Sequence, residues 1–169
     1  TIYKRPFGYV PSPVTHTVAK LDLCAGAVSD QHWQSNPYII THIPVGLYPT
    51  AVETTPDGRY VLVLNSHENT VSLIDTTLDI VIEVVIRLDE FATDMVLLGT
   101  STEPVLYFVF THSRMISAYY PVNDDPTKWE TGGQWELPDE GAIDCEKRLS
   151  VDPTTVETLA MTGVPRPAK

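Results

Sequence analysis

The sequence is short of basic residues and of long apolar runs, and each shortage excludes a class of function. Lys and Arg together number 11 against 22 Asp and Glu, which gives a formal net charge of −11 at pH 7. Nucleic acids and anionic membrane surfaces attract basic proteins, so this charge argues against both as partners. The longest apolar run, near residues 80–86, is interrupted by Glu83 and is much shorter than a transmembrane segment. We therefore expect no nucleic-acid partner and no transmembrane segment.

Cysteine is also scarce. The two cysteines, Cys24 and Cys145, lie far apart in the sequence, and no metal-ligand spacing surrounds either one. A disulfide between them is compatible with the sequence but is not required by it. The chain begins at Thr1 rather than with Met, so we expect it to be either a processed chain or a piece of a longer one.

The chain does contain many short β-type segments separated by turn residues, most regularly between residues 47 and 88. The triplet Pro56-Asp57-Gly58 has turn chemistry, since Pro presets φ, Asp bonds its own backbone and Gly takes the φ > 0 position. Turn signals of this kind divide the region into four predicted antiparallel strands: Thr50–Thr54, Arg59–Leu64, Thr70–Asp75 and Ile80–Leu88. Fourteen prolines in the whole chain also argue against a helical bundle.

This region resembles the YVTN-type repeat of β-propeller proteins. The matching stretches are Pro56–Val61 (PDGRYV), Val63–Asn65 (VLN) and Thr70–Asp75 (TVSLID), and the resemblance covers mainly residues 17–161. The family includes lactonase-like, surface-layer and redox-enzyme propellers, so the resemblance implies a fold more firmly than an activity. Because proteins with this repeat are mostly exported, it also implies a periplasmic or extracellular location.

The pattern recurs at intervals of about forty to fifty residues, which is the length of a propeller blade. Thr17–Asp22 (TVAKLD) matches Thr70–Asp75 position by position. Further along the chain, Val105–Thr111 corresponds to Tyr60–Asn65, and Met115–Tyr120 corresponds to Thr70–Asp75. We therefore predict an all-β protein made of about three blades, each a four-stranded antiparallel sheet.

The predicted blades give the chain a definite order. We expect an irregular lead-in or edge segment at 1–16, the outer strands of one blade at 17–46, complete blades at 47–88 and 89–138, inner strands at 139–162 and a frayed tail at 163–169. Three blades fall short of the usual four to eight and would leave apolar blade faces open to water. The chain is therefore expected to be a fragment of a larger propeller, to dimerise, or to belong to a larger assembly.

Two histidines occupy equivalent predicted turns of neighbouring blades. His67 follows the second strand of one blade, and His112 follows the second strand of the next. Equivalent turns lie on the same rim of a propeller, so the two could form a metal or haem ligand pair, by analogy with redox propellers. The alternative is that both are polar turn residues without a shared ligand.

Three acidic residues are candidates for a cation site. Asp94 and Asp144 share a repeat position on the first strand of a blade, which lines the central channel of a propeller. Together with Glu53 of the neighbouring blade they could form a ring that binds Ca²⁺. The alternative is ordinary solvated polarity in the channel. No other cofactor is predicted.

Tryptophans provide the last candidates. Two long insertions, at 24–36 and 121–134, contain or adjoin Trp33, Trp129 and Trp135. Aromatic residues in such insertions can bind a partner protein or can cover a blade edge.

No nucleophile elbow and no phosphate-binding glycine loop occurs, so no catalytic residue is predicted. The sequence favours an exported, non-catalytic β-propeller module that acts in protein binding or as a structural subunit. Alternatives are a piece of a lactonase-like or redox dehydrogenase-type enzyme completed by another chain, and a surface-layer or adhesive protein with further repeats.

Overall fold

The computed structural model describes residues 6–23, 38–100, 102–123 and 125–136, which contain eleven β-strands. These are β1 (Phe7–Ser12), β2 (Thr17–Asp22), β3 (Ile39–Pro44), β4 (Pro49–Thr54), β5 (Tyr60–Asn65), β6 (Thr70–Asp75), β7 (Ile80–Arg87), β8 (Asp94–Gly99), β9 (Pro104–Phe110), β10 (Met115–Val122) and β11 (Asp125–Glu136). In the described part of the chain, no helix has the length and apolar character that a membrane crossing requires.

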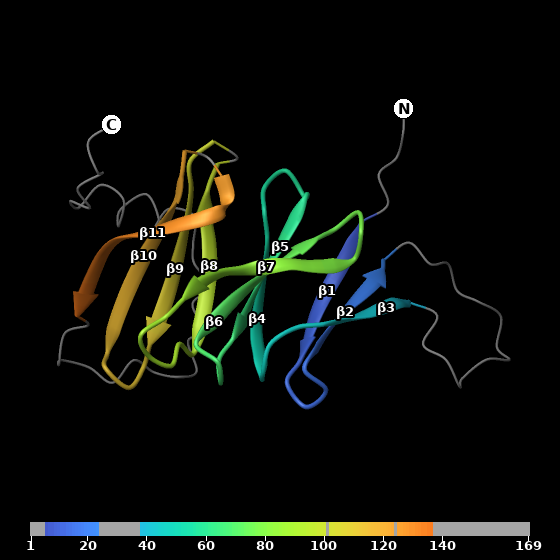
Figure 1. The fold of residues 1–169 in the computed structure, drawn as a ribbon, viewed down its shortest axis with the longest axis horizontal. Coiled ribbons are helices and arrows are strands. Elements are labelled where there is room, and N and C mark those ends of the chain that lie inside the picture. The colour runs from blue at the N-terminus through green and yellow to red at the C-terminus, as the bar shows by residue number, and fades with distance from the viewer. Residues whose placement is uncertain (1–5, 24–37, 101, 124, 137–169) are drawn as a thin grey trace, which may run out of the picture.

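The strands form three antiparallel sheets, which confirms the all-β prediction. Their spatial orders are β1-β2-β3, β4-β5-β6-β7 and β11-β10-β9-β8, and we call them the first, middle and third sheets. Consecutive strands are neighbours within each sheet, so every sheet is a simple meander. The sheets stand face to face like a fan (Figure 1), with β4 in contact with both β1 and β8, and β7 in contact with both β3 and β11. This is the arrangement of propeller blades.

The turn between β4 and β5 shows why the middle sheet folds where the sequence predicts. Gly58 has a φ of 71°, a conformation that residues with a side chain rarely adopt. Asp57 Oδ1 accepts hydrogen bonds from the Arg59 backbone N–H and from Thr55 Oγ1. The Pro56-Asp57-Gly58 triplet is therefore a turn, as predicted.

Of the two alternatives expected for the start of the chain, the first sheet shows that the edge segment is correct and the irregular lead-in is wrong over Phe7–Ser12. Phe7–Ser12 is a regular strand, β1, which pairs with β2 along its whole length. The sheet therefore has three strands rather than the two outer strands expected at 17–46. Pro11 lies within β1, where the missing N–H is tolerated because β1 is the edge strand of its sheet.

The third sheet has the four strands expected of a complete blade at 89–138. Its fourth strand is the long β11, which takes up most of the insertion at 121–134. β11 pairs with β10 through two register shifts, one between Ala118 and Tyr119 and one between Pro121 and Val122. Bulges and edge strands accommodate proline and glycine, so the composition of the insertion did not prevent pairing. The inner strands expected at 139–162 and the frayed tail expected at 163–169 lie outside the described residues.

The middle sheet is buried on both faces. On one face, Val61 and Val63 pack against Val18 and Ile43 of the first sheet. On the other face, a larger cluster joins the middle and third sheets, and it includes Leu62, Leu64, Val71, Leu73, Ile86, Leu88, Ala92, Met95, Leu106, Phe108 and Phe110. Alternate residues of β5 therefore enter different cores, which explains why the strand is apolar without interruption.

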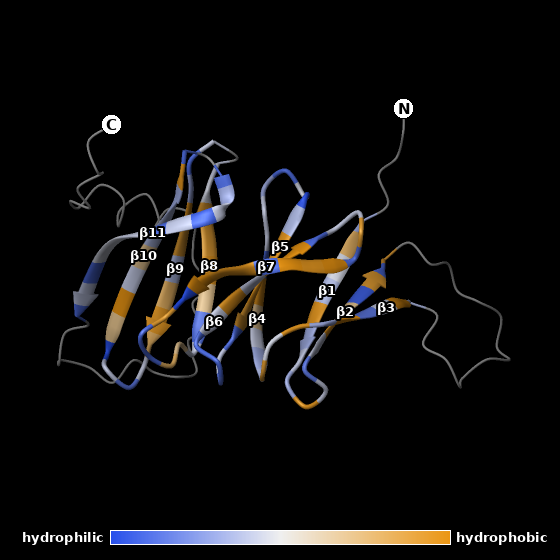
Figure 2. Cartoon of the chain, in the orientation of Figure 1, coloured by the Kyte–Doolittle hydropathy of each residue, from blue (hydrophilic) through white to orange (hydrophobic). Residues whose placement is uncertain are grey.

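Apolar residues also continue onto the outermost strand of the middle sheet. Figure 2 shows this along β7, and Ile80, Ile82 and Val84 are 52%, 45% and 39% exposed. β7 pairs with β6 through two register shifts, and such bulges make an edge strand a poor template for further pairing.

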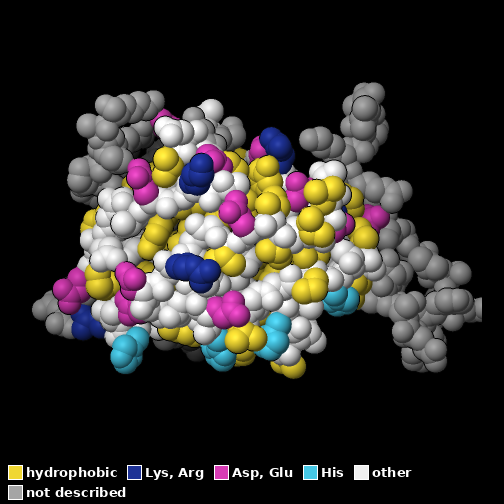
Figure 3. Space-filling view, viewed as in Figure 1, with side chains coloured by type: hydrophobic (Ala, Val, Ile, Leu, Met, Phe, Trp, Pro, Cys, Tyr) yellow, Lys and Arg dark blue, Asp and Glu magenta, His cyan; other side chains and the backbone are white. Residues whose placement is uncertain are grey.

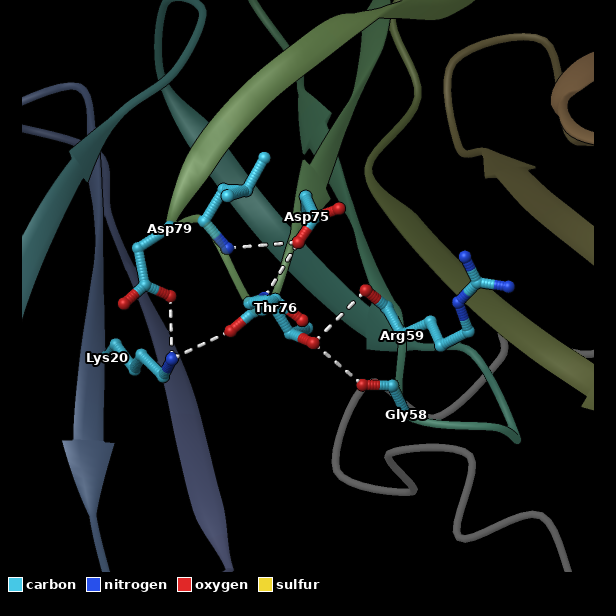
Figure 4. A network of polar contacts seen from close by, with 8 residues as sticks. Lys20, Gly58, Arg59, Asp75, Thr76 and Asp79 are labelled. Carbon is cyan, nitrogen blue, oxygen red and sulfur yellow. Dashed lines mark hydrogen bonds and ion pairs between the residues drawn. The ribbon is translucent and has the colours of Figure 1, made fainter.

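One buried charge connects the first sheet to the middle sheet. Lys20 of β2 is 5% exposed, and its Nζ donates to Asp79 Oδ1 at 2.6 Å and to the Thr76 carbonyl at 2.9 Å (Figure 4). Both partners lie in the β6–β7 turn, so the lysine reaches from one blade to the next. The Phe7 ring covers the ammonium at 4.6 Å from its centroid.

Candidate functional site on the turn rim

Three equivalent hairpin turns bring histidines to one edge of the fan. His16 lies in the β1–β2 turn, His67 in the β5–β6 turn and His112 in the β9–β10 turn. Each turn ends in a non-glycine residue with positive φ: His16 (56°), Asn69 (54°) and Arg114 (57°). Figure 3 shows the histidine side chains gathered along the lower edge of the molecule, which we call the turn rim. Sequence reasoning missed His16 because it did not place a strand before that turn.

Tyr48, in the connection from β3 to β4, also has a positive φ and lies beside the His16 turn. Its φ is 57°, an outlier for a bulky side chain. Contacts from both sides hold it there: its N–H donates to His16 Nδ1 at 3.2 Å, and its carbonyl accepts from the Ser66 N–H at 3.1 Å. Because His16 Nδ1 is the acceptor, the proton of the neutral imidazole lies on Nε2.

The Tyr48 ring begins a row of aromatic side chains. It stacks on His67 with the centroids 4.3 Å apart and the planes 9° from parallel. Phe91, in the connection from β7 to β8, provides the next ring, whose centroid is 6.2 Å from that of His67. Tyr48 and Phe91 are 39% and 42% exposed, so their rings remain accessible. We call Tyr48, His67 and Phe91 the aromatic row.

The histidine pair predicted as a metal or haem ligand set is placed on the same rim, as expected. His67, however, is stacked against Tyr48 and lies next to Phe91. Among the residues that the structure describes, no three His, Cys, Asp or Glu side chains gather closely enough to hold a metal ion. The shared ligand of His67 and His112 therefore stays a prediction.

Two of the three acidic residues predicted as a cation site come from neighbouring inner strands. Glu53 is in β4 and Asp94 begins β8, and these strands are in contact. Burial and, to a smaller extent, the Asp94 charge raise the pKa of the Glu53 carboxyl, although a hydrogen bond from the Leu97 backbone opposes them. Asp144 lies outside the described residues, so the Ca²⁺ site also stays a prediction.

Of the tryptophans, Trp129 lines a cleft at the opposite end of the blades. Its indole N–H donates to the Pro126 carbonyl at 2.8 Å, and its ring packs against the core between the middle and third sheets. The cleft has a volume of about 170 Å³ and is lined by Thr55, Pro56, Asp57, Arg59, Tyr60, Pro104, Pro121, Pro126 and Trp129. Trp129 therefore packs at a blade edge and also lines a cleft, and its role in binding a partner stays a prediction.

The remaining candidates are placed as follows. Trp135 is half-buried in β11, and its ring lies against Gly133, where an added Cβ would come within 3.0 Å. Trp33 and both cysteines, Cys24 and Cys145, lie outside the described residues.

Comparisons with solved structures support the blade arrangement. The chain is similar to hydrazine synthase of Kuenenia stuttgartiensis, with a TM-score of 0.58 and 17% identity over 78% of this chain and 34% of that one. It is similar to a protein of unknown function from Desulfotomaculum acetoxidans, with a TM-score of 0.58 and 12% identity over 78% and 38%. Dihydro-heme d1 dehydrogenase gives a TM-score of 0.53 and 15% identity over 79% and 26%.

These similarities show the fold alone, because all identities are low. No protein-family description and no curated protein matches the sequence. The chain spans between about a quarter and two fifths of the length of the structures it resembles. The chain thus has a β-propeller fold, in which three sheets are the part described here.

Proposed function

We propose that the chain is an exported, non-catalytic β-propeller module of the YVTN-repeat type, which acts as a structural or protein-binding part of a larger assembly. In this proposal the open face of the first sheet is the contact surface. The similarity of the middle-sheet sequence to exported repeat proteins supports the location, and the open face supports the role.

The open face is the side of the first sheet turned away from the middle sheet. Val18 and Lys20 point toward the middle sheet, so the residues that alternate with them point outward. A cross-strand row on the outward side consists of Val10, Ala19 and His42. Val10 is 48% exposed.

Two further apolar residues extend this surface. Leu23 is 57% exposed and lies within 3.4 Å of where a Cβ on Gly8 would stand, which places it on the outward side. Ile40, on the β3 edge of the sheet, is 50% exposed next to a register shift in the β2–β3 pairing. Exposed apolar side chains therefore occur at both edges of the first sheet, together with His42 in the outward row.

The middle sheet shows how the equivalent face is buried when another sheet packs on it. Val63 and Ile74 occupy the same positions in β5 and β6 that Val10 and Leu21 occupy in β1 and β2. Val63 and Ile74 are fully buried against the first sheet. The equivalent positions of the first sheet are apolar in the same way, which is the single observation that most supports a further sheet or protein on this face.

The third sheet repeats the pattern at the other end of the fan. Along β9, Leu106, Phe108 and Phe110 are buried toward the middle sheet, and Val105, Tyr107 and Val109 alternate with them and are partly exposed. A strand that is apolar on both faces is typical of a sheet covered on both sides.

Light scattering of the full chain tests the proposal. We expect a mass well above the 18.8 kDa of one chain, and we expect Val10→Asp to reduce it to that of the monomer. The matched control is Val14→Asp, because Val14 is 87% exposed in the β1–β2 turn and lies off the open face. A parent chain that is monomeric, or a Val10→Asp variant that associates as the parent does, would refute the assignment of this face.

A further inference from the structure

We propose that the aromatic row on the turn rim is a binding site for arginine and lysine side chains of a basic partner protein. This goes beyond the proposed function, because the turn rim is separate from the open faces of the first and third sheets. The proposal depends on the backbone of Tyr48, on the arrangement of the rings and on the charge around them.

The backbone of Tyr48 has a positive φ, which it shares with His16 and Arg114 on the same rim, and the contacts of its ring are what set it apart from them. A position with φ near 57° is most easily occupied by Gly, or by Asn, as at position 69 of the same rim. Tyr48 holds this conformation at an energetic cost, and two hydrogen bonds, to His16 and from Ser66, keep it in place. Strain of this kind is concentrated at binding sites, where the surrounding structure maintains it.

The ring arrangement forms a platform that crosses the boundaries between sheets. Tyr48 follows the first sheet, His67 belongs to the middle sheet and Phe91 leads to the third. The three residues are far apart in the sequence, but their rings are in contact and form one row in the folded protein. Because His16 and Ser66 hold Tyr48 in place, the platform is already ordered before a ligand binds.

The charge around the row favours a cation over a neutral or anionic group. Glu68 follows His67 in the turn, and its carboxylate lies against Gly46, two residues before Tyr48. Glu90 precedes Phe91, and its Oε1 accepts a hydrogen bond from Ser113 Oγ at 2.6 Å. Carboxylates therefore lie near both ends of the row, in a chain whose net charge is −11.

Two arginines also lie at this end of the blades. Arg114 already has an interaction partner, and Arg87 is the exposed last residue of β7, opposite Thr70 in the ladder. The chain uses the same chemistry internally, since Lys20 lies over Phe7 and Arg59 lies 5.3 Å from the Tyr60 ring centroid. Aromatic faces attract guanidinium and ammonium groups, and neighbouring carboxylates strengthen this attraction.

The test is an NMR titration of the isotope-labelled full chain with three short peptides. The chemical shifts of its backbone amides and aromatic rings report binding. The peptides are Gly-Arg-Gly-Arg-Gly, the same peptide with Gln in place of Arg, and the same peptide with Phe in place of Arg. We expect the arginine peptide to shift the resonances of Tyr48, His67 and Phe91, and we expect this binding to weaken as salt is added. The glutamine peptide should shift none of them.

Matched variants separate binding from folding. Tyr48→Gly removes the ring and relieves the strained backbone, so we expect an unchanged or higher melting temperature together with about fivefold weaker binding of the arginine peptide. Asn69→Gly makes the same kind of backbone change on the same rim without removing a ring, and it should leave binding unchanged. Phe91→Ala should also weaken binding about fivefold and provides the decisive variant if Tyr48→Gly does not fold.

Three results would overturn the proposal. These are equal shifts with the glutamine peptide, tighter binding of the phenylalanine peptide, which would indicate an apolar docking site instead, and a loss of binding in Asn69→Gly as large as that in Tyr48→Gly. None of them bears on the association of the open faces, which light scattering measures independently.

Discussion

The two interfaces between the three sheets are made differently, although the same repeat forms both. The interface between the first and middle sheets has a small core of five buried aliphatic residues and one partly buried ion pair, in which Lys20 is the buried member. The interface between the middle and third sheets has eleven buried hydrophobic residues, including Phe108 and Phe110. The first interface therefore includes a charged pair, whereas the second combines a larger hydrophobic cluster with uncharged polar groups such as Ser66, whose Oγ donates to the Ala92 carbonyl.

The difference is concentrated at one repeat position. Lys20 of β2 corresponds to Leu73 of β6, since each is the fourth residue of its strand. Leu73 is fully buried in the apolar core, whereas Lys20 reaches across to Asp79 and to the Thr76 carbonyl. A buried lysine is costly unless it is paired, so the first interface is stable only with the β6–β7 turn in this position. The repeat therefore specifies burial at this position, and the neighbouring turn decides whether a charge is tolerated.

The largest effect is expected from a charge placed in the first interface without a partner. Val63→Asp should unfold the protein, because Val63 is fully buried and an unpaired charge there costs about 3 kcal/mol or more against a marginal stability. Thermal unfolding followed by circular dichroism measures this. Ile82→Asp on the exposed edge of β7 is the control and should change the melting temperature little. An unchanged melting temperature for Val63→Asp would mean that β5 does not face the first sheet.

A large cavity should weaken the apolar interface next. Phe108→Ala removes a fully buried ring that also makes an edge-to-face contact with Tyr119, and we expect a loss of about 3–5 kcal/mol in the free energy of unfolding. Phe91→Ala, on the turn rim, should cost much less because Phe91 is 42% exposed. Denaturant unfolding of both variants checks the difference, and equal losses would contradict the two-core description.

The ion pair distinguishes the first interface from the second. Asp79→Asn keeps a residue that tolerates the φ of 57° at this position but leaves Lys20 without its counter-ion, so we expect a loss of about 2 kcal/mol. Lys20→Met makes the position apolar, as the equivalent position is in the middle sheet, and should change the free energy of unfolding little. Denaturant unfolding of each single variant and of the double variant tests this. If Lys20→Met were as destabilising as Asp79→Asn, the pair would contribute net stability rather than specificity.

The smallest effect is expected from Glu53, between the inner strands of the second interface. Burial, followed by the Asp94 charge, raises the pKa of Glu53 in the folded state, so the folded protein holds this proton more tightly than the unfolded chain does. The resulting stability is fully present below the unfolded pKa and is lost as the pH rises through the folded pKa. Glu53→Gln should therefore raise the melting temperature at pH 7 and have little effect near pH 3. An effect of the same size at both values would show that the charge of Glu53 is not responsible.

Several features of the fold follow from local sequence and could be predicted. Turn chemistry at Pro56-Asp57-Gly58 placed the β4–β5 hairpin and predicted the strand that follows it. These signals lie within a few residues of one another, so no knowledge of distant contacts is needed. The equivalent positions of His67 and His112 followed from the same repeat.

Other features were missed because their local signals point the wrong way. β1 contains Gly8 and Pro11, and β11 contains Gly132 and Gly133, so both segments are unlike ordinary strands in composition. Among the described strands each lies at the edge of its sheet and pairs on one side, and such residues are tolerated at that place. Edge position is a property of the assembled sheet and does not show in the sequence of the strand.

The sequence by itself determined the blade repeat, because strand length, turn chemistry and alternating burial act over a few neighbouring residues. The tertiary structure alone decided which side chains meet between blades. Tyr48 stacks on His67, and Lys20 reaches Asp79, only because the sheets are packed at this spacing and register. Contacts between turns of different sheets depend on how whole sheets are placed, and no local preference of the residues involved specifies that placement.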